Sequence, residues 1–242
     1  MKFCLRMTAA LMMAAPVAAR AQAVVGPYVS LGLGGVNTEA LGYQYNAGLV
    51  PVPIVPGGLG RRLTPNVEGK IVTRPAAGGS LGVGFGFGNG VSLELDAVAQ
   101  RATVHGQDVS GQKLMMTGGL DSYGVMANML YTLPLNLPVS PYLGGGVGYQ
   151  WTALNSDLRS KSAGIYVSGT KVSFAYDLIA GLAYAVPVVP GLTVTAEYRF
   201  TQLTTTRHYH LGSVYPLAAS EMRLGQMATQ QIDFGLRYQF SL

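Results

Sequence analysis

Charged residues and long apolar runs are both scarce in this sequence of 242 residues. Charged side chains make up 11% of the chain, against roughly 25% in soluble domains, although hydrophobic residues reach 49%. Beyond residue 23, no apolar run reaches the roughly 18 residues that a transmembrane helix needs. A membrane helix is therefore excluded, and the apolar residues must be arranged in another pattern.

Cysteine is nearly absent, because Cys4 is the only one. It lies before the apolar stretch Met7–Val17, which follows a basic start and leads into the small residues Ala21–Ala23. This arrangement predicts a secretory signal peptide over 1–23, cleaved after Ala23 or Ala21. Cleavage leaves a mature domain, 24–242, for which we expect no disulfide, no thiolate metal site and no lipidation.

Strict alternation of apolar and small residues is abundant instead. In "GVGFGFGNG" (Gly82–Gly90), glycine occupies every second position. A glycine-rich nucleotide loop would need a following helix, but 91–100, "VSLELDAVAQ", alternates again. The stretch therefore predicts one face of a β-strand, and Asn89-Gly90 predicts a hairpin turn to the next strand.

The same alternation recurs in eight stretches, at about 28–34, 80–87, 91–100, 122–133, 142–153, 174–184, 192–200 and 231–242. Short links without charge (88–90, 134–140, 186–191) alternate with long ones (35–79, 102–121, 155–170, 203–229). This order is typical of a membrane barrel. We therefore predict an all-β fold, an eight-stranded antiparallel up-and-down transmembrane β-barrel with short periplasmic turns and long external loops.

The composition of the two faces separates a membrane barrel from a soluble one. A soluble, lipocalin-like barrel turns its apolar face inward, but here the other face carries Gly, Ser, Thr and charge, which suits the narrow interior of eight strands. Aromatic girdles are expected at the turn side (Phe87, Tyr131, Tyr184, Phe240) and at the loop side (Tyr123, Trp151, Phe174, Phe200).

Three stretches, "SPYLGGGVGYQW" (Ser140–Trp151), "FAYDLIAGLAY" (Phe174–Tyr184) and "TAEYRF" (Thr195–Phe200), resemble the strands of the small outer-membrane β-barrel family. That family includes the outer-membrane-protein-A type transmembrane domain and related surface antigens. The last strand is similar to the family's C-terminal assembly signal, with Leu242 where an aromatic residue is usual. The resemblance implies the outer membrane of a Gram-negative bacterium, contact with its assembly machinery, and varied roles.

Seven charged residues alternate onto the inward face: Glu94, Asp96, Asp177, Glu197, Arg199, Asp233 and Arg237. Buried charges need partners, so carboxylates should bridge the two arginines. One interpretation is a salt-bridged structural plug. The other is a narrow, gated path that weakly prefers cations, because acids outnumber bases on this face.

The long-link side is basic. Its bases are Arg61, Arg62, Lys70, Arg74, Arg101, Lys113, Arg159, Lys161, Lys171, Arg207 and Arg223, and its acids are Glu39, Glu68, Asp108, Asp121, Asp157 and Glu221. We expect Arg101, Arg159 and Lys171, nearest the strand ends, to contact phosphates of outer-membrane lipids, including lipopolysaccharide. The alternative is that they are ordinary solvated loop charges.

Catalysis and metal binding have little support. The histidines, His105, His208 and His210, all fall in long links, and two of them without a third ligand make a poor metal site. Ser213 near His210 has no third group to orient it. We therefore expect no enzyme, no cofactor and no metal, with an outer-membrane hydrolase as a remote alternative.

The first long link contains "GLVPVPIVPGGLGRRLTP" (48–65), whose Pro and Gly content predicts neither helix nor strand, but a lid or a contact surface. Two function classes remain: a structural or narrow-permeability, porin-like role, and surface recognition through the external loops. We expect a monomer that contacts no nucleic acid and has no peptidoglycan-binding domain after the barrel.

Overall fold

The computed structural model describes residues 24–240 except 46–48, 56–57, 64–66, 110–111, 115–116, 136, 161–162 and 214–219. Side chains are described outside 45–67, 105–117, 155–167 and 210–221. The expected signal peptide and Leu242 lie outside the described residues. Within them, no helix is long and apolar enough to cross a membrane.

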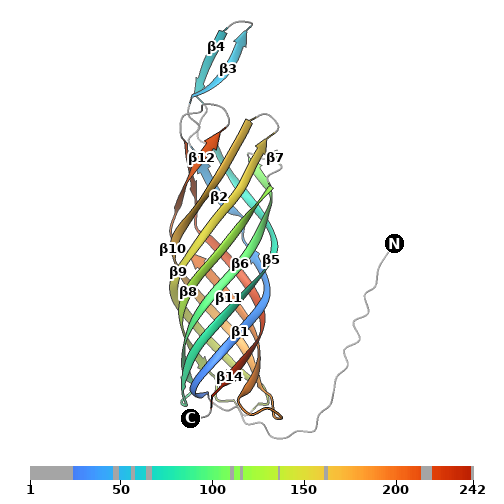
Figure 1. Ribbon diagram of the computed structural model, residues 1–242, viewed down its shortest axis with the longest axis vertical. Coiled ribbons are helices and arrows are strands. Elements are labelled where there is room, and N and C mark those ends of the chain that lie inside the picture. The colour runs from blue at the N-terminus through green and yellow to red at the C-terminus, as the bar shows by residue number, and fades with distance from the viewer. Residues whose placement is uncertain are drawn as a thin grey trace, which may run out of the picture.

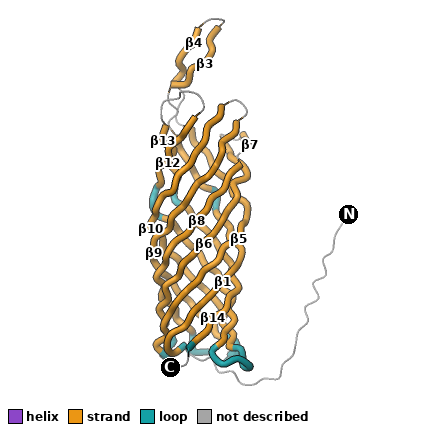
Figure 2. Tube along the Cα trace, viewed as in Figure 1, coloured by secondary structure: helices purple, strands orange, loops and turns teal. Residues whose placement is uncertain are grey.

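All regular structure in the described residues is β-strand (Figures 1 and 2). The strands are β1 (Val25–Thr38), β2 (Leu41–Tyr45), β3 (Leu49–Val55), β4 (Gly58–Leu63), β5 (Val67–Phe87), β6 (Val91–Val109), β7 (Gln112–Leu114), β8 (Thr117–Thr132), β9 (Ser140–Ser160), β10 (Ala163–Ala185), β11 (Leu192–Leu203), β12 (Arg207–Ser213), β13 (Ser220–Leu224) and β14 (Met227–Gln239).

Eight of these strands close a barrel. In order around the wall, β1, β5, β6, β8, β9, β10, β11 and β14 each pair antiparallel with the next, and β14 returns to β1. Closure satisfies the backbone of every neighbouring strand and leaves no sheet edge. The predicted eight-stranded antiparallel barrel is confirmed.

The wall continues above this ring. Strands β2 and β12 continue β1 and β11, and β13 leads into β14, with interruptions at 39–40, 204–206 and 225–226. β2 pairs with β5 and β13, and β12 pairs with β13 and β10, so the upper wall also has eight members. Counting only described residues, we call 25–38, 77–100, 122–152, 172–203 and 227–239 the lower section, and 41–45, 67–76, 101–121, 153–171 and 204–226 the upper section.

This upper wall corrects the expected long loops. Much of 35–79, 102–121, 155–170 and 203–229 is strand, and β9 and β10 stay paired as far as Ser160 and Ala163. The proline-rich stretch at 48–65, expected to form neither helix nor strand, contains β3 and β4, which pair as a separate two-stranded hairpin. Figure 1 shows this hairpin beyond the end of the barrel. Pairing to a neighbour supports these segments although their composition is poor for strands.

The short turns agree with the sequence. Gly88 and Gly90 both take positive φ, 78° and 91°, and the Asn89 side-chain oxygen accepts a hydrogen bond from the Val91 amide at 3.0 Å. Positive φ is the conformation that glycine adopts without strain. The glycines flanking Asn89 thus reverse the chain between β5 and β6, as predicted.

The two sections present opposite surfaces. Of the large apolar side chains that the structure shows exposed, only Val72 belongs to the upper section. Among the upper-section side chains that the structure describes, most of the outward ones are polar, as in Gln44, Glu68, Lys70 and Arg223. The exposed apolar residues therefore form an outer band that extends over the lower section and ends where the upper section begins.

Aromatic side chains border this band. Phe87, Tyr131, Tyr184 and Phe240 are exposed at the turn end. At the other end, Tyr123 stacks on Trp151, with ring centroids 5.8 Å apart and planes 9° from parallel. Rings with this placement are typical of the two membrane–water interfaces, so the Tyr123–Trp151 level marks the upper boundary of the band.

Candidate functional site

Glycines on the inner face of the lower section make room for two large rings. A Cβ atom added at Gly84 would overlap the Tyr28 ring, and one added at Gly181 would overlap the Tyr142 ring. Both tyrosines are almost fully buried. The alternating glycines of the sequence therefore create the space in which the polar lumen is packed.

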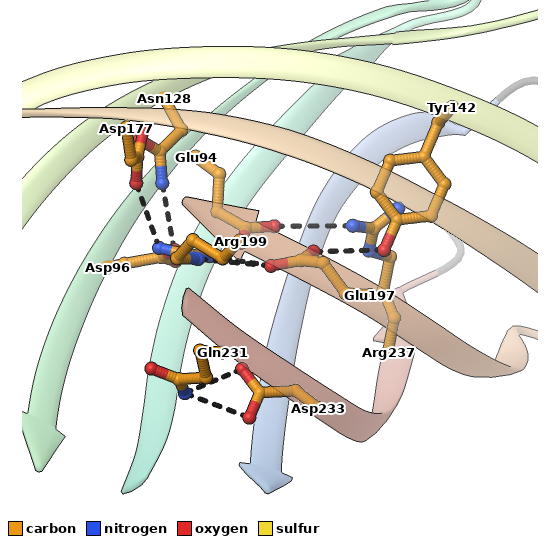
Figure 3. Close-up of polar contacts among 10 residues, drawn as sticks. All are labelled: Glu94, Asp96, Asn128, Tyr142, Asp177, Glu197, Arg199, Gln231, Asp233 and Arg237. Carbon is orange, nitrogen blue, oxygen red and sulfur yellow. Dashed lines mark hydrogen bonds and ion pairs between the residues drawn. The ribbon is translucent and has the colours of Figure 1, made fainter. Parts of the chain in front are cut away.

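Arg199 is the centre of a buried ion network in that lumen (Figure 3). Its guanidinium donates to Asp96 Oδ2 at 2.7 Å, to Asp177 Oδ2 at 3.2 Å and to Glu197 Oε1 at 3.0 Å. Those carboxylates come from β6, β10 and β11, so one arginine ties together three strands of the wall. Charge-assisted bonds of this kind are about twice as strong as neutral ones.

Amide and hydroxyl donors complete the network. Asn128 donates to Asp96 Oδ2 at 2.8 Å, and the Tyr142 hydroxyl donates to Glu197 Oε2 at 2.9 Å. The sequence analysis did not select these two residues, although each has the inward parity of its strand. Because carboxylate oxygens only accept, neutral donors are needed wherever acids outnumber arginines.

Arg237 lies between two aromatic rings. Its guanidinium carbon is 4.8 Å from the Tyr28 centroid and 5.5 Å from the Tyr142 centroid. Its Nη2 is 3.6 Å from Glu94 Oε2, a longer ion pair than those of Arg199. The remaining acid, Asp233, accepts two bonds from Gln231, at 2.8 and 2.7 Å. All seven charged residues selected from the sequence thus lie on the inner side of the lower section, six of them buried and Glu197 partly so.

Apolar side chains fill the lumen above this network, mostly from the upper section. The buried cluster consists of Leu41, Tyr43, Ile71, Ala102, Val104, Leu120, Met126, Leu154, Ala175, Leu203, Tyr209, Met222, Leu224 and Met227. Within it, burial raises the pKa of the Tyr209 hydroxyl, which donates to the Thr152 carbonyl oxygen at 3.2 Å. Among the described side chains, the interior is therefore mainly polar in the lower section and mainly apolar in the upper section.

Arg207 departs from the sequence prediction. It was expected among the external bases, but it is 3% exposed and points inward at the base of the upper section. It donates to Thr152 Oγ1 at 3.1 Å and to the Gly225 carbonyl oxygen at 3.3 Å. Its inward direction follows from the alternation with the buried Tyr209 two residues later.

The three expected lipid-contacting bases occupy different places. Arg101 lies outside, just above the aromatic boundary, with its side chain 79% exposed, and it donates to Asp121 Oδ1 at 2.7 Å. Lys171 is half-buried, at the inward parity of β10. Arg159 pairs with Gly164 near the far end of β9, and its side chain lies outside those described. These bases do not form a single patch.

The three histidines belong to the upper section. His208 is exposed on β12, while the side chains of His105 and His210 lie outside those described. In the described part of the chain, no three His, Cys, Asp or Glu side chains are grouped so that they could hold a metal ion.

Comparison with known proteins gives results at the levels of sequence and fold. Residues 7–240 match the family described as outer membrane protein beta-barrel domain. An outer membrane protein of Gluconacetobacter diazotrophicus is 33% identical over 204 residues, which cover 78% of this chain and 50% of that relative. The chain therefore spans about half the length of this curated relative.

Two solved structures resemble the barrel. OprG from Pseudomonas aeruginosa has a TM-score of 0.59 at 14% identity, over 90% of this chain and 99% of that one. Neisserial surface protein A has a TM-score of 0.50 at 14% identity, over the same shares. At such identities the likeness shows the fold alone.

Proposed function

The chain belongs to the outer-membrane protein β-barrel family, and on that premise we propose that it is a closed membrane anchor that presents its upper section at the cell surface. Its location is the outer membrane of a Gram-negative bacterium. Short turns of such barrels face the periplasm and the opposite ends face outward. The upper section and the β3–β4 hairpin accordingly belong to the outer surface.

Two barriers in the lumen, one above the other, support this proposal. In the lower section, the Arg199 network joins three strands across the lumen through bonds of 2.7 to 3.2 Å. In the upper section, buried Leu, Met and Tyr side chains occupy the interior. An ion would have to replace its hydration shell with carbon atoms there, which is unfavourable. Conduction would require both seals to open together, so a porin-like role has less support.

The outer wall of the upper section offers a place for recognition. A hollow of about 790 Å³ lies in this wall where β2, β5 and β13 meet, and it is lined by Gly42, Tyr43, Gln44, Glu68, Gly69, Lys70, Thr206, Arg223 and Gly225. Within it, Gln44 donates to Glu68 Oε1 at 3.0 Å. Charges of both signs and amide groups in a hollow of this size favour a polar surface ligand. This role requires no catalytic group.

Conductance tests the closed anchor. We expect wild-type protein in planar bilayers to give no open steps, with a general porin as the positive control. Arg199→Ala should also stay silent, because the apolar seal above it is intact. Clear steps from the wild type would contradict a closed lumen, and steps from Arg199→Ala alone would show that the upper cluster is not a seal.

A further inference from the structure

The ladder between β10 and the β11–β12 wall is interrupted at one level. Below the interruption, Ala175 pairs with Leu203, and above it Ser168 pairs with His210. The sum of paired residue numbers is the same on both sides, yet 169–173 and 205–209 form no ladder pairs with each other. Gly169, with φ of 149°, stands at the upper edge.

Two cations flank this interruption, Lys171 on β10 and Arg207 on β12. Lys171 pairs with Thr152 on β9, and the Thr152 hydroxyl accepts a hydrogen bond from Arg207 at 3.1 Å. Both cations have the inward parity of their strands. Like charges on neighbouring strands of a sheet are destabilising when they lie close together. A group of opposite charge between them would remove that repulsion.

Arg207 is also a buried charge without an acid. Among the side chains that the structure describes, its partners are the Thr152 hydroxyl, the Gly225 carbonyl and the Met227 sulfur, all neutral. Its Nε has no hydrogen-bond partner, and neither has Ser173 Oγ, which is buried on the facing strand. Tyr209 supplies no negative charge, since burial raises its pKa. The nearest inward acids that the structure describes on adjoining strands, Asp177 and Asp233, are engaged by Arg199 and Gln231. Such unsatisfied buried donors call for a missing partner.

From this geometry we infer an anion site for a phosphate group, formed by Arg207, Lys171 and Ser173 behind the interrupted ladder. Arg supplies a planar fork of donors and Lys a point charge, a combination suited to phosphate. Lys171 pairs with Thr152, adjacent to Trp151 in the aromatic boundary. Phosphates of outer-leaflet lipids lie at that depth, and a free phosphate ion shares the same chemistry. The site is independent of the role proposed for the upper section.

Thermal unfolding of the refolded barrel in maltoside detergent tests the site. One arm adds inorganic phosphate against chloride at equal ionic strength. The other adds diphosphorylated lipid A against the same lipid with both phosphates removed. We expect the unfolding midpoint of the wild type to rise by several degrees with the phosphate form in at least one arm. A rise only with the lipid identifies a headgroup, and a rise only with the ion identifies free phosphate.

Variants separate binding from folding. In phosphate-free buffer, Arg207→Met should unfold at or above the wild-type midpoint, because an unpaired buried charge is removed, and it should lose the gain from phosphate. Lys171→Met removes the like charge near Arg207, so it should unfold at or slightly above the wild-type midpoint without phosphate and lose most of the gain, which keeps the test decisive if Arg207→Met folds poorly. Arg101→Met, outside the wall, should retain the full gain from inorganic phosphate. An equal gain in the wild type and both site variants, or no gain in either arm, would overturn the site.

Discussion

In the lower section apolar side chains point outward and charged side chains point inward, whereas the upper section reverses both faces. The same wall therefore passes through two surroundings. Lipid selects an apolar outer face, and the narrow lumen then collects the polar groups. Water around the upper section selects a polar outer face, and the hydrophobic effect fills the interior with Leu, Met and Tyr. Surroundings, more than the strand pairing, decide which face is apolar.

The largest expected effect tests the polar interior of the lower section. Arg199→Ala leaves three carboxylates without their shared cation, and breaking a buried pair costs about 3–5 kcal/mol. Water entering the lumen lowers that loss. The measurement is the unfolding midpoint in detergent, followed by the mobility difference between boiled and unboiled samples. The matched control is Arg101→Ala, whose exposed pair with Asp121 should leave the midpoint unchanged. An unchanged midpoint for Arg199→Ala would show that this network does not hold the wall together.

A smaller effect tests the outer faces. Leu95→Arg places a charge in the middle of the apolar band, and we expect a loss of about 2–4 kcal/mol in unfolding free energy. Gln44→Arg, on the exposed wall of the upper section, should cost almost nothing. Equilibrium unfolding in lipid vesicles compares the two. Similar losses of unfolding free energy for both variants would show that the outer faces of the two sections do not lie in different surroundings.

The smallest effect concerns the packing of the polar lumen. Gly181→Val should push the Tyr142 ring from its place and cost about 1–3 kcal/mol, the usual range for overpacking. Gly35→Val is the control, because a Cβ at Gly35 meets no atom within 4 Å. If both valine variants lower the unfolding midpoint equally, Gly181 is needed for its backbone conformation and not for the space that the Tyr142 ring occupies.

The lower section could be predicted from the sequence because its pattern is regular. Every second residue faces lipid, and an unbroken period of two identifies both the strands and the inward charges. The Asn89-Gly90 pair predicted the turn between two strands from the local sequence alone. Neither inference needs knowledge of which strands are neighbours.

The upper section could not be predicted in this way. Thr38 and Leu41 both face inward although they are three positions apart, because the break at 39–40 shifts the phase of the alternation. A similar shift at 225–226 brings Leu224 and Met227 to the same face. Polar outward residues then look like loop composition. Arg207 was misplaced because the polar residues around it resemble loop composition, although it keeps the inward phase of Leu203 and Tyr209.

Cysteine labelling tests the central claim most directly, namely that the upper section stands outside the membrane on a closed anchor. Cys4 is the only natural cysteine and precedes the expected cleavage site, so single cysteines can be placed at Gln44, Leu81 and Asn89 without background. With a membrane-impermeant maleimide on intact cells, the account predicts labelling at position 44 and none at 81 or 89. Labelling at 81 as fast as at 44, or labelling at 89, would contradict it.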